Sequence, residues 1–170
     1  MTEEERSIIN QFYFSEISKE LFLEFYPVDF KKDKEHIFLS VKSAYEARNS
    51  GDLDLALTLI IFDTDIVDAD RFVELLCLLL RETWHQQHEN ITRILQEIKS
   101  PKSIDTLYQT ALTKFDYLDY DDSIPLAIKC IHALGDINTA YAKEKLQLLA
   151  SSENSVIKEK AEKQLYYYKK

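Results

Sequence analysis

A shortage of turn-forming residues is the feature that most restricts how this chain can fold. Only two glycines and three prolines occur among its 170 residues. A fold with many strands needs such residues at its turns, and the abundant Leu, Ile, Ala, Glu and Lys instead favour helices. We therefore predict an all-α protein with a single domain over residues 1–170, which is long enough to bury a large core.

The first 33 residues are rich in aromatic side chains and are predicted to form an N-terminal cap. Thr2 and Glu5 have the spacing of a capping box at the start of a helix that runs on into ISKELFLEFYP, and Pro27 ends this segment. A stack of helical repeats has an exposed first unit that must be sealed. The phenylalanines predicted to seal it are Phe12, Phe14, Phe22 and Phe25.

Residues 34–90 show helical periodicity with short breaks. One predicted helix is broken at Gly51, and Asp52 is expected to cap the next one. A later helix, started by Asp68 or Asp70, carries a complete apolar stripe formed by Phe72, Leu75, Leu76, Leu79 and Leu80. The stripe after it comprises Trp84, His88, Ile91, Leu95 and Ile98. Helices joined by such short turns predict antiparallel helix pairs.

Two internal matches indicate repeated helix pairs in the C-terminal half. Leu95–Leu107 matches Leu134–Leu146 at a shift of 39 residues, whereas Ile124–Leu134 matches Ser155–Leu165 at a shift of 31. The difference leaves eight extra residues, which correspond in number to Phe115–Asp122. Insertions into stacked repeats fall in loops along one edge and often carry binding residues.

The segment LAIKCIHALGDI, residues 126–137, resembles the second helix and turn of a HEAT-type repeat, with Gly135 at the expected helix end. The likeness is clearest over residues 91–170 and degenerate over 34–90. It implies an α-solenoid of antiparallel helix pairs. Residues 79–112 also resemble small bacterial HEAT-repeat proteins, some of which look like immunity proteins that neutralise a toxin domain.

The charge of the chain points to a basic protein as the partner. A net charge of −9 and a pI near 5 oppose binding to nucleic acid or to an anionic membrane surface. The acidic N-terminus and the lack of a long apolar run predict a soluble protein that is not exported. We expect it to be monomeric when free. Cys77 and Cys130 lie in apolar runs, which suits the reducing cytoplasm.

The stretch TKFDYLDYDDSI is the strongest candidate binding site in the sequence. Tyrosines can anchor an interface while carboxylates align Arg and Lys of a basic partner, although a solvated turn is the alternative. The residues predicted to bind here are Asp116, Tyr117, Asp119, Tyr120, Asp121 and Asp122. A second acidic run has two carboxylates that helix capping does not explain, Asp63 and Asp65.

No motif predicts a catalytic or metal site. His85 and His88, with Glu89, could face one ion, but His88 lies on an apolar stripe and is interpreted as a hydrogen-bonded core histidine. Phosphate loops and nucleophile motifs are absent from the sequence. We therefore expect a protein-binding module without enzyme activity or cofactor, and an immunity protein in particular. The alternatives are a general HEAT-repeat adaptor and, less favoured, a chromophore-lyase-like or other enzyme.

Overall fold

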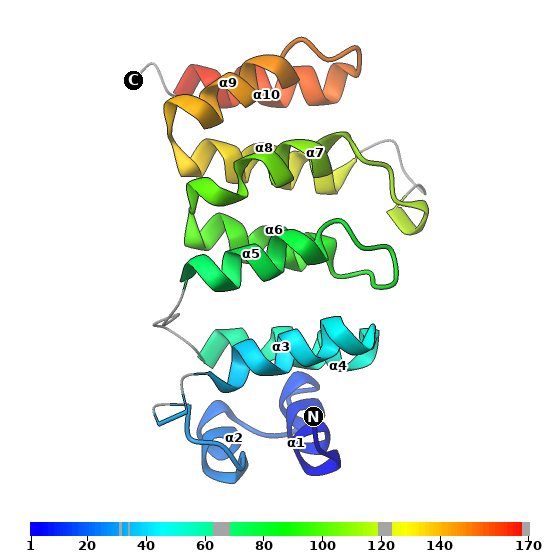
Figure 1. Cartoon of the computed structure of the whole chain (residues 1–170), viewed down its shortest axis with the longest axis vertical. Helices are drawn as coiled ribbons and strands as arrows, with labels where there is room; N and C mark the ends of the chain where they lie inside the picture. Colours follow the sequence, from blue (N-terminus) through cyan, green and yellow to red (C-terminus); the bar gives the residue numbers. More distant parts are fainter. Residues whose placement is uncertain (31, 34, 63–68, 119–123, 168–170) are drawn as a thin grey trace. The chain divides into compact units, whose positions relative to one another are not determined.

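The computed structural model describes residues 1–30, 32–33, 35–62, 69–118 and 124–167. These residues form ten α-helices and three short 3₁₀ helices, with no strand among them (Figure 1). The prediction of an all-α protein is confirmed. No helix in these ranges is both long enough and apolar enough to cross a membrane. The chain divides into an N-terminal unit, residues 1–68, and a C-terminal unit, residues 69–170.

The helices of the N-terminal unit are α1 (Glu3–Tyr13), α2 (Lys19–Phe25), α3 (His36–Ala47), α4 (Ser50–Thr58) and the 3₁₀ helix η1 (Leu59–Phe62). The predicted capping box is confirmed, because the Thr2 amide donates to Glu5 Oε2 at 2.6 Å and the Glu5 amide donates to Thr2 Oγ1 at 3.2 Å. The predicted run of one helix into ISKELFLEFYP is wrong. The chain leaves α1 after Tyr13, and Ser15 takes a left-handed φ of 59° before α2 starts.

Aromatic rings form much of the core of the N-terminal unit. Phe22 is fully buried, and its ring centroid lies 5.1 Å from that of Phe12 and 4.9 Å from that of Tyr26. In contrast, Phe14 and Phe25 are 68% and 55% exposed. A seven-residue helix can turn only one face inward, and α2 turns the face that carries Phe22. The predicted aromatic packing therefore holds for Phe12 and Phe22 but not for the other two.

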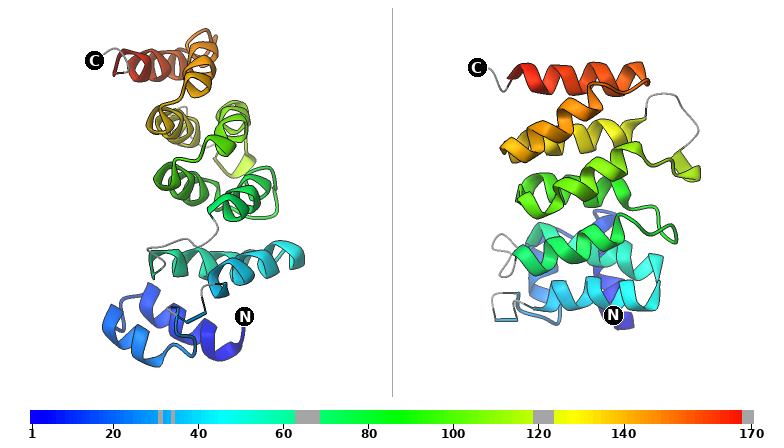
Figure 2. Two further views of the ribbon diagram at one scale, coloured as in Figure 1. Left: turned by 60° about the vertical axis from the view of Figure 1, so that its left-hand side comes forward. Right: turned by 45° about the horizontal axis from the view of Figure 1, so that its top comes forward.

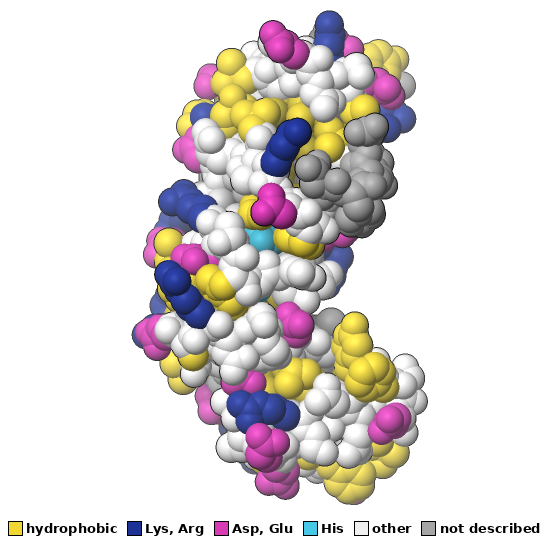
Figure 3. Space-filling model, turned by 90° about the vertical axis from the view of Figure 1, so that its right-hand side faces the viewer, with side chains coloured by type: hydrophobic (Ala, Val, Ile, Leu, Met, Phe, Trp, Pro, Cys, Tyr) yellow, Lys and Arg dark blue, Asp and Glu magenta, His cyan; other side chains and the backbone are white. Residues whose placement is uncertain are grey.

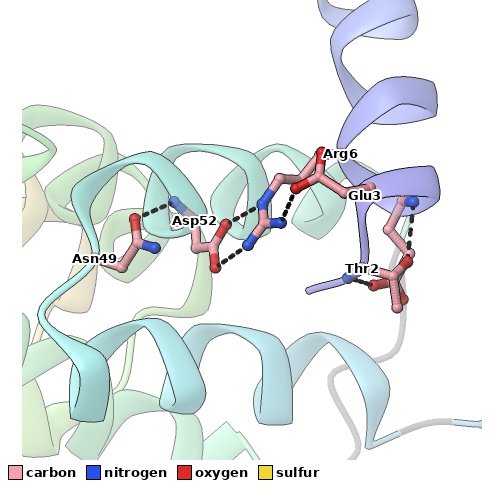
Figure 4. Close-up of polar contacts among 6 residues, drawn as sticks. Thr2, Glu3, Arg6, Asn49 and Asp52 are labelled. Carbon is pink, nitrogen blue, oxygen red and sulfur yellow. Dashed lines mark hydrogen bonds and ion pairs between the residues drawn. The ribbon is translucent and has the colours of Figure 1, made fainter.

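An ion pair joins α1 to α4 (Figure 4). The guanidinium of Arg6 donates from Nε and Nη2 to the two carboxylate oxygens of Asp52, at 2.8 and 3.0 Å. The hydrogen bond from Arg6 lowers the pKa of the Asp52 carboxyl, against a smaller opposing effect of burial. Asp52 thus links two helices that lie far apart in the sequence.

The N-cap residue of α4 is Asn49, whose Oδ1 accepts the amide of Asp52 at 3.0 Å. The prediction of a helix break at Gly51 with Asp52 as the cap is therefore wrong. The preceding helix has already ended where Arg48 takes a left-handed φ of 49°, and Gly51 lies inside α4. Asn49 is favoured at this position because its short amide side chain can accept the orphan amide hydrogen of the first turn.

Three successive helix pairs build the C-terminal unit, namely α5 (Ala69–Leu79) with α6 (His88–Ile98), α7 (Ile104–Leu112) with α8 (Pro125–Ile137), and α9 (Ala140–Leu149) with α10 (Ser155–Tyr167). A short 3₁₀ helix, η2 (Pro101–Ser103), precedes α7. Within this unit α6 packs against α8, α8 against α10, and α7 against α9 (Figure 2). The second helices of successive pairs thus lie next to one another, as do the first helices of the last two pairs.

The apolar stripe of α5 is confirmed, because each of its members is at most 6% exposed: Phe72, Leu75, Leu76, Leu79 and Leu80. The prediction of the next apolar stripe, which starts at Trp84, is only partly right. Ile91 and Leu95 are fully buried in α6, but Trp84 lies in the loop before that helix, which begins only at His88.

Gly135 does not end its helix as the HEAT-type pattern predicts. Helix α8 continues to Ile137 and ends at Asn138, which has a left-handed φ of 50°. A side chain at Gly135 would meet the amide group of Gln164 on α10. The glycine therefore leaves room for the Gln164 side chain of α10, and Asn138 supplies the helix end.

Candidate functional site

The loop between α7 and α8 is longer than its counterpart in the next helix pair. It spans residues 113–124, whereas the loop between α9 and α10 spans residues 150–154. The predicted insertion of eight residues falls inside this longer loop. We call residues 115–122 the acidic insertion. Its first part includes the 3₁₀ helix η3 (Asp116–Leu118), and residues 119–123 lie outside the described residues.

The start of the acidic insertion packs onto His88, the first residue of α6. Phe115 is 8% exposed, and its ring centroid lies 3.9 Å from that of His88. The hydroxyl of Tyr117 lies 2.8 Å from Nδ1 of the same histidine. Asp116, between the two aromatic residues, is exposed. Phe115 and Tyr117 therefore anchor the insertion, and the carboxylate of Asp116 between them stays at the surface.

His88 is fully buried and has both ring nitrogens engaged. Nε2 lies 2.8 Å from the carbonyl oxygen of Glu82, so Nε2 carries the proton, and Nδ1 accepts the hydroxyl of Tyr117. Burial lowers the pKa of His88 from 6.5 to about 4, against the opposing effect of the Glu82 bond. The prediction that His88 is a packed, hydrogen-bonded core histidine is confirmed.

His85, in the loop that precedes α6, repeats this arrangement. Its Nε2 donates to the carbonyl oxygen of Leu79 at 3.0 Å, and its Nδ1 accepts the amide of Gln87 at 3.1 Å. The ring stacks on that of His88 with centroids 4.6 Å apart, and the Trp84 ring meets it edge-on at 4.8 Å. All four nitrogens of the two histidines therefore have partners within the protein.

This geometry positions a loop and does not resemble a metal or proton-transfer site. His85 and His88 direct their nitrogens at protein partners, so they do not converge with Glu89 on a common point. Among the residues that the structure describes, no group of three or more His, Cys, Asp or Glu side chains could hold a metal ion. A general base also needs a nitrogen that can reach a substrate, and none is available here.

The structure describes Asp116 and Tyr117 among the residues predicted to bind a partner. Asp116 is exposed, and Tyr117 is partly buried against His88. The remaining predicted residues lie outside the described part of the chain: Asp63, Asp65, Asp119, Tyr120, Asp121 and Asp122. The hydroxyl of Tyr117 is used internally, which the sequence did not indicate.

Several neighbours of the insertion were not predicted as site residues. Together with the start of the insertion they line a hollow of about 320 Å³, formed by Thr83, Trp84, His85, Gln86, Lys114, Phe115, Asp116 and Tyr117. Figure 3 shows the side of the molecule that carries the loop between α5 and α6 and the loop between α7 and α8, which lie on the right in Figure 1. The two aromatic residues Phe115 and Tyr117, close together in the sequence, were the one sequence signal for this packing, since large rings bury much apolar area.

A larger hollow of about 600 Å³ shares Lys114 and Phe115 with the first and extends to the beginnings of α8 and α10. Its lining is mostly apolar, with Leu118, Pro125 and Val156 among the contributors. The acidic insertion thus begins between two hollows of the C-terminal unit. Comparison of the chain with protein-family models, with curated proteins and with solved structures finds no match.

Proposed function

We propose that this chain is a protein-binding module that contacts a basic partner through its acidic insertion. The observation that carries the proposal is the anchoring of Phe115 and Tyr117 on His88, on either side of Asp116 and ahead of the other aspartates of the insertion. A loop held at its start loses less conformational entropy when it binds than a free loop does. Its carboxylates can attract and align lysine and arginine side chains of the partner.

Tyr117 takes a different role in this proposal from Tyr120. Its hydroxyl bonds to a buried histidine, so Tyr117 supports the insertion and holds the exposed Asp116 beside it. The proposed contacts with the partner then come from Asp116, Tyr120 and the other aspartates of the insertion. Asp63 and Asp65 belong to the N-terminal unit and form a second proposed contact region.

Within this class we favour an immunity-type inhibitor that covers the active surface of a basic toxin domain. The resemblance of residues 79–112 to small bacterial HEAT-repeat proteins supports this choice, as does the packing of equivalent helices in the C-terminal unit, which fits an α-solenoid. Gly135 departs from the HEAT pattern, so it supports neither this candidate nor the second one, a general HEAT-repeat adaptor. Catalysis is not part of either proposal. Two buried free cysteines suit a cytoplasmic location.

The proposal is tested by capturing the partner and comparing two charge-matched variants. The first changes four aspartates of the insertion to asparagine: Asp116, Asp119, Asp121 and Asp122. The second changes four exposed glutamates on or between α9 and α10 to glutamine: Glu144, Glu153, Glu159 and Glu162. Both remove four negative charges, so a difference between them reports position and not net charge.

We expect the captured partner to be basic and the asparagine variant to lose roughly 1 to 3 kcal/mol of binding free energy for each charge-assisted contact removed. The glutamine variant should bind almost as the natural chain does. Equal losses in the two variants would contradict a local site. Normal binding by the asparagine variant, with a loss on changing Asp63 and Asp65, would move the site to the N-terminal unit.

A further inference from the structure

Helix α2 of the N-terminal unit buries only one of its side chains. Phe22 is buried, and the other six residues of the helix are exposed. Three of the exposed side chains are large and apolar: Leu21 at 41%, Leu23 at 51% and Phe25 at 55% exposure. The helix packs against α1 (Figure 1), which ends in the exposed Tyr13. Most of the apolar side chains of α2 are therefore directed away from the core.

Such exposure is unusual for a helix at the surface of a soluble protein. A surface helix normally has polar residues on the face that points away from the core, and large exposed apolar patches mark contact sites. Leu21 and Phe25 lie one turn apart on one side of α2, and Leu23 lies on the other side. We call five side chains of this helix the outer surface of α2: Glu20, Leu21, Leu23, Glu24 and Phe25.

The charges on and beside the outer surface of α2 are mainly negative. Residues 13–25, all of them described, contain three glutamates and one lysine, which give a net charge of −2. Glu20 and Glu24 lie one turn apart on the side of the helix opposite Phe22, so carboxylates and apolar side chains are interleaved. The Glu24 carboxylate forms no ion pair with any residue that the structure describes.

These charges decide between the possible occupants of the outer surface of α2. A second copy of the chain in a symmetric dimer would bring the same glutamates against one another. Anionic lipid headgroups would be repelled in the same way. A protein segment that carries apolar side chains next to lysine or arginine is attracted by both features of the surface.

We propose that the outer surface of α2 binds a basic amphipathic helix of a protein partner. Apolar side chains of that helix pack on Leu21, Leu23 and Phe25, and its lysine or arginine side chains pair with Glu20 and Glu24. An amphipathic helix suits this surface because it presents apolar and basic side chains in adjacent stripes. The surface lies in the N-terminal unit, so it is separate from the acidic insertion and does not depend on it.

The test uses the full chain and a fluorescein-labelled peptide that forms a helix with leucines on one face and lysines on the other. A second peptide has glutamates in place of the lysines, and a third has serines in place of the leucines. We expect a saturable rise in anisotropy with the lysine peptide and no saturable binding of the serine peptide. The glutamate peptide should bind more weakly by about tenfold or more, because like charges then face one another.

Two triple substitutions to serine locate the bound peptide. The first changes the three apolar residues of the outer surface of α2, and the second changes three exposed leucines of the C-terminal unit: Leu78, Leu112 and Leu148. The first should weaken binding of the lysine peptide by about tenfold or more, because burial of leucine and phenylalanine drives the contact. The second should leave the affinity almost unchanged. Circular dichroism checks that both variants are folded, as expected for changes at exposed positions.

A matched pair of charge variants tests the carboxylates without changing any apolar side chain. Glu20→Gln with Glu24→Gln should weaken binding of the lysine peptide by about two- to tenfold, as for two partly exposed ion pairs. Glu159→Gln with Glu162→Gln, two exposed positions on α10, should leave it almost unchanged. Equal losses in the two serine variants or in the two glutamine variants would overturn the inference, as would equal binding of the lysine and glutamate peptides.

The other occupants give results of their own. Vesicles of phosphatidylcholine that bind the natural chain but not the first serine variant would show that the surface takes a membrane. A dimer seen by sedimentation of the natural chain and lost in that variant would show that it takes a second copy. Either result would overturn the inference, whereas a monomer that binds the lysine peptide and ignores the vesicles supports it.

Discussion

The two units of the chain carry equal numbers of acidic residues and differ twofold in basic ones. Residues 1–68 hold 15 acidic and seven basic side chains, a net charge of −8. Residues 69–170 hold 15 acidic and 14 basic side chains, a net charge of −1. The acidity of the whole chain is thus mainly a shortage of lysine and arginine in the N-terminal unit.

In the C-terminal unit the negative charge is local. The loop of residues 113–124 has a net charge of −3, so the rest of that unit is slightly positive. Fields from exposed charges are screened beyond about 8 Å at physiological ionic strength, so a partner responds to the nearest carboxylates. Net charge alone therefore cannot locate the binding surface. Negative charge is spread through the sequence of the N-terminal unit and concentrated in one loop of the C-terminal unit, and each can attract a basic partner.

The interiors of the two units differ too, and the largest expected effect concerns the N-terminal core. Phe22→Ala should lower the free energy of unfolding by about 3 to 5 kcal/mol, because it removes a fully buried ring from the centre of the aromatic cluster. Phe25→Ala, on the same helix but 55% exposed, should change it by less than about 0.5 kcal/mol. Urea unfolding of both variants measures the difference, and similar losses would mean that this unit lacks the aromatic core.

In the C-terminal unit the buried histidine predicts a dependence of stability on pH. The pKa of His88 is lowered to about 4 in the folded chain, below its ordinary 6.5, so the unfolded chain binds the proton more tightly. Stability should be complete above pH 6.5 and should fall by up to about 3 kcal/mol as the pH drops to 4.

His88→Gln removes this group and should flatten that part of the pH profile, measured by urea unfolding at a series of pH values. The matched control is His132→Gln, which removes an exposed histidine of the same unit and keeps His88. A profile that keeps its full slope in His88→Gln would show that His88 is not the group responsible.

Anchoring of the acidic insertion predicts a smaller effect. Tyr117→Phe keeps the ring and removes the hydroxyl that donates to His88, so it should cost about 1 kcal/mol of unfolding free energy. Tyr108→Phe is the control, because the Tyr108 hydroxyl has no hydrogen-bond partner among the described residues. If both variants melt at the temperature of the natural chain, the Tyr117 bond does not hold the insertion.

The smallest expected changes in unfolding free energy come from two substitutions at the start of α4, and they have opposite signs. Asn49→Ala should cost about 1 kcal/mol by removing the cap, whereas Gly51→Ala should stabilise by about 0.5 to 1 kcal/mol because the glycine lies within the helix. A side chain at Gly51 would make only ordinary contact with Asn49. Thermal unfolding of the two variants decides between this assignment and a helix break at Gly51, for which the alanine would destabilise.

Local patterns predicted the features that depend on neighbours in the sequence. The capping box at Thr2, the stripe of α5 and the position of the insertion all follow from spacing over short distances or from matching repeats. The packing of the insertion could not be predicted in this way, because His88 and Tyr117 are 29 residues apart. The same holds for Gly135, whose role depends on Gln164 of another helix.

The most direct test of the central claim is the association rate of the chain with its captured partner, measured from low to physiological ionic strength. The natural chain should associate rapidly at low salt and lose this advantage as salt rises, since clustered carboxylates steer a basic partner. The four-asparagine variant of the insertion should lose most of the salt dependence, and the four-glutamine variant of α9 and α10 should keep it. Equal salt dependence in the two variants would contradict the account, because the steering charge would then be that of the whole chain.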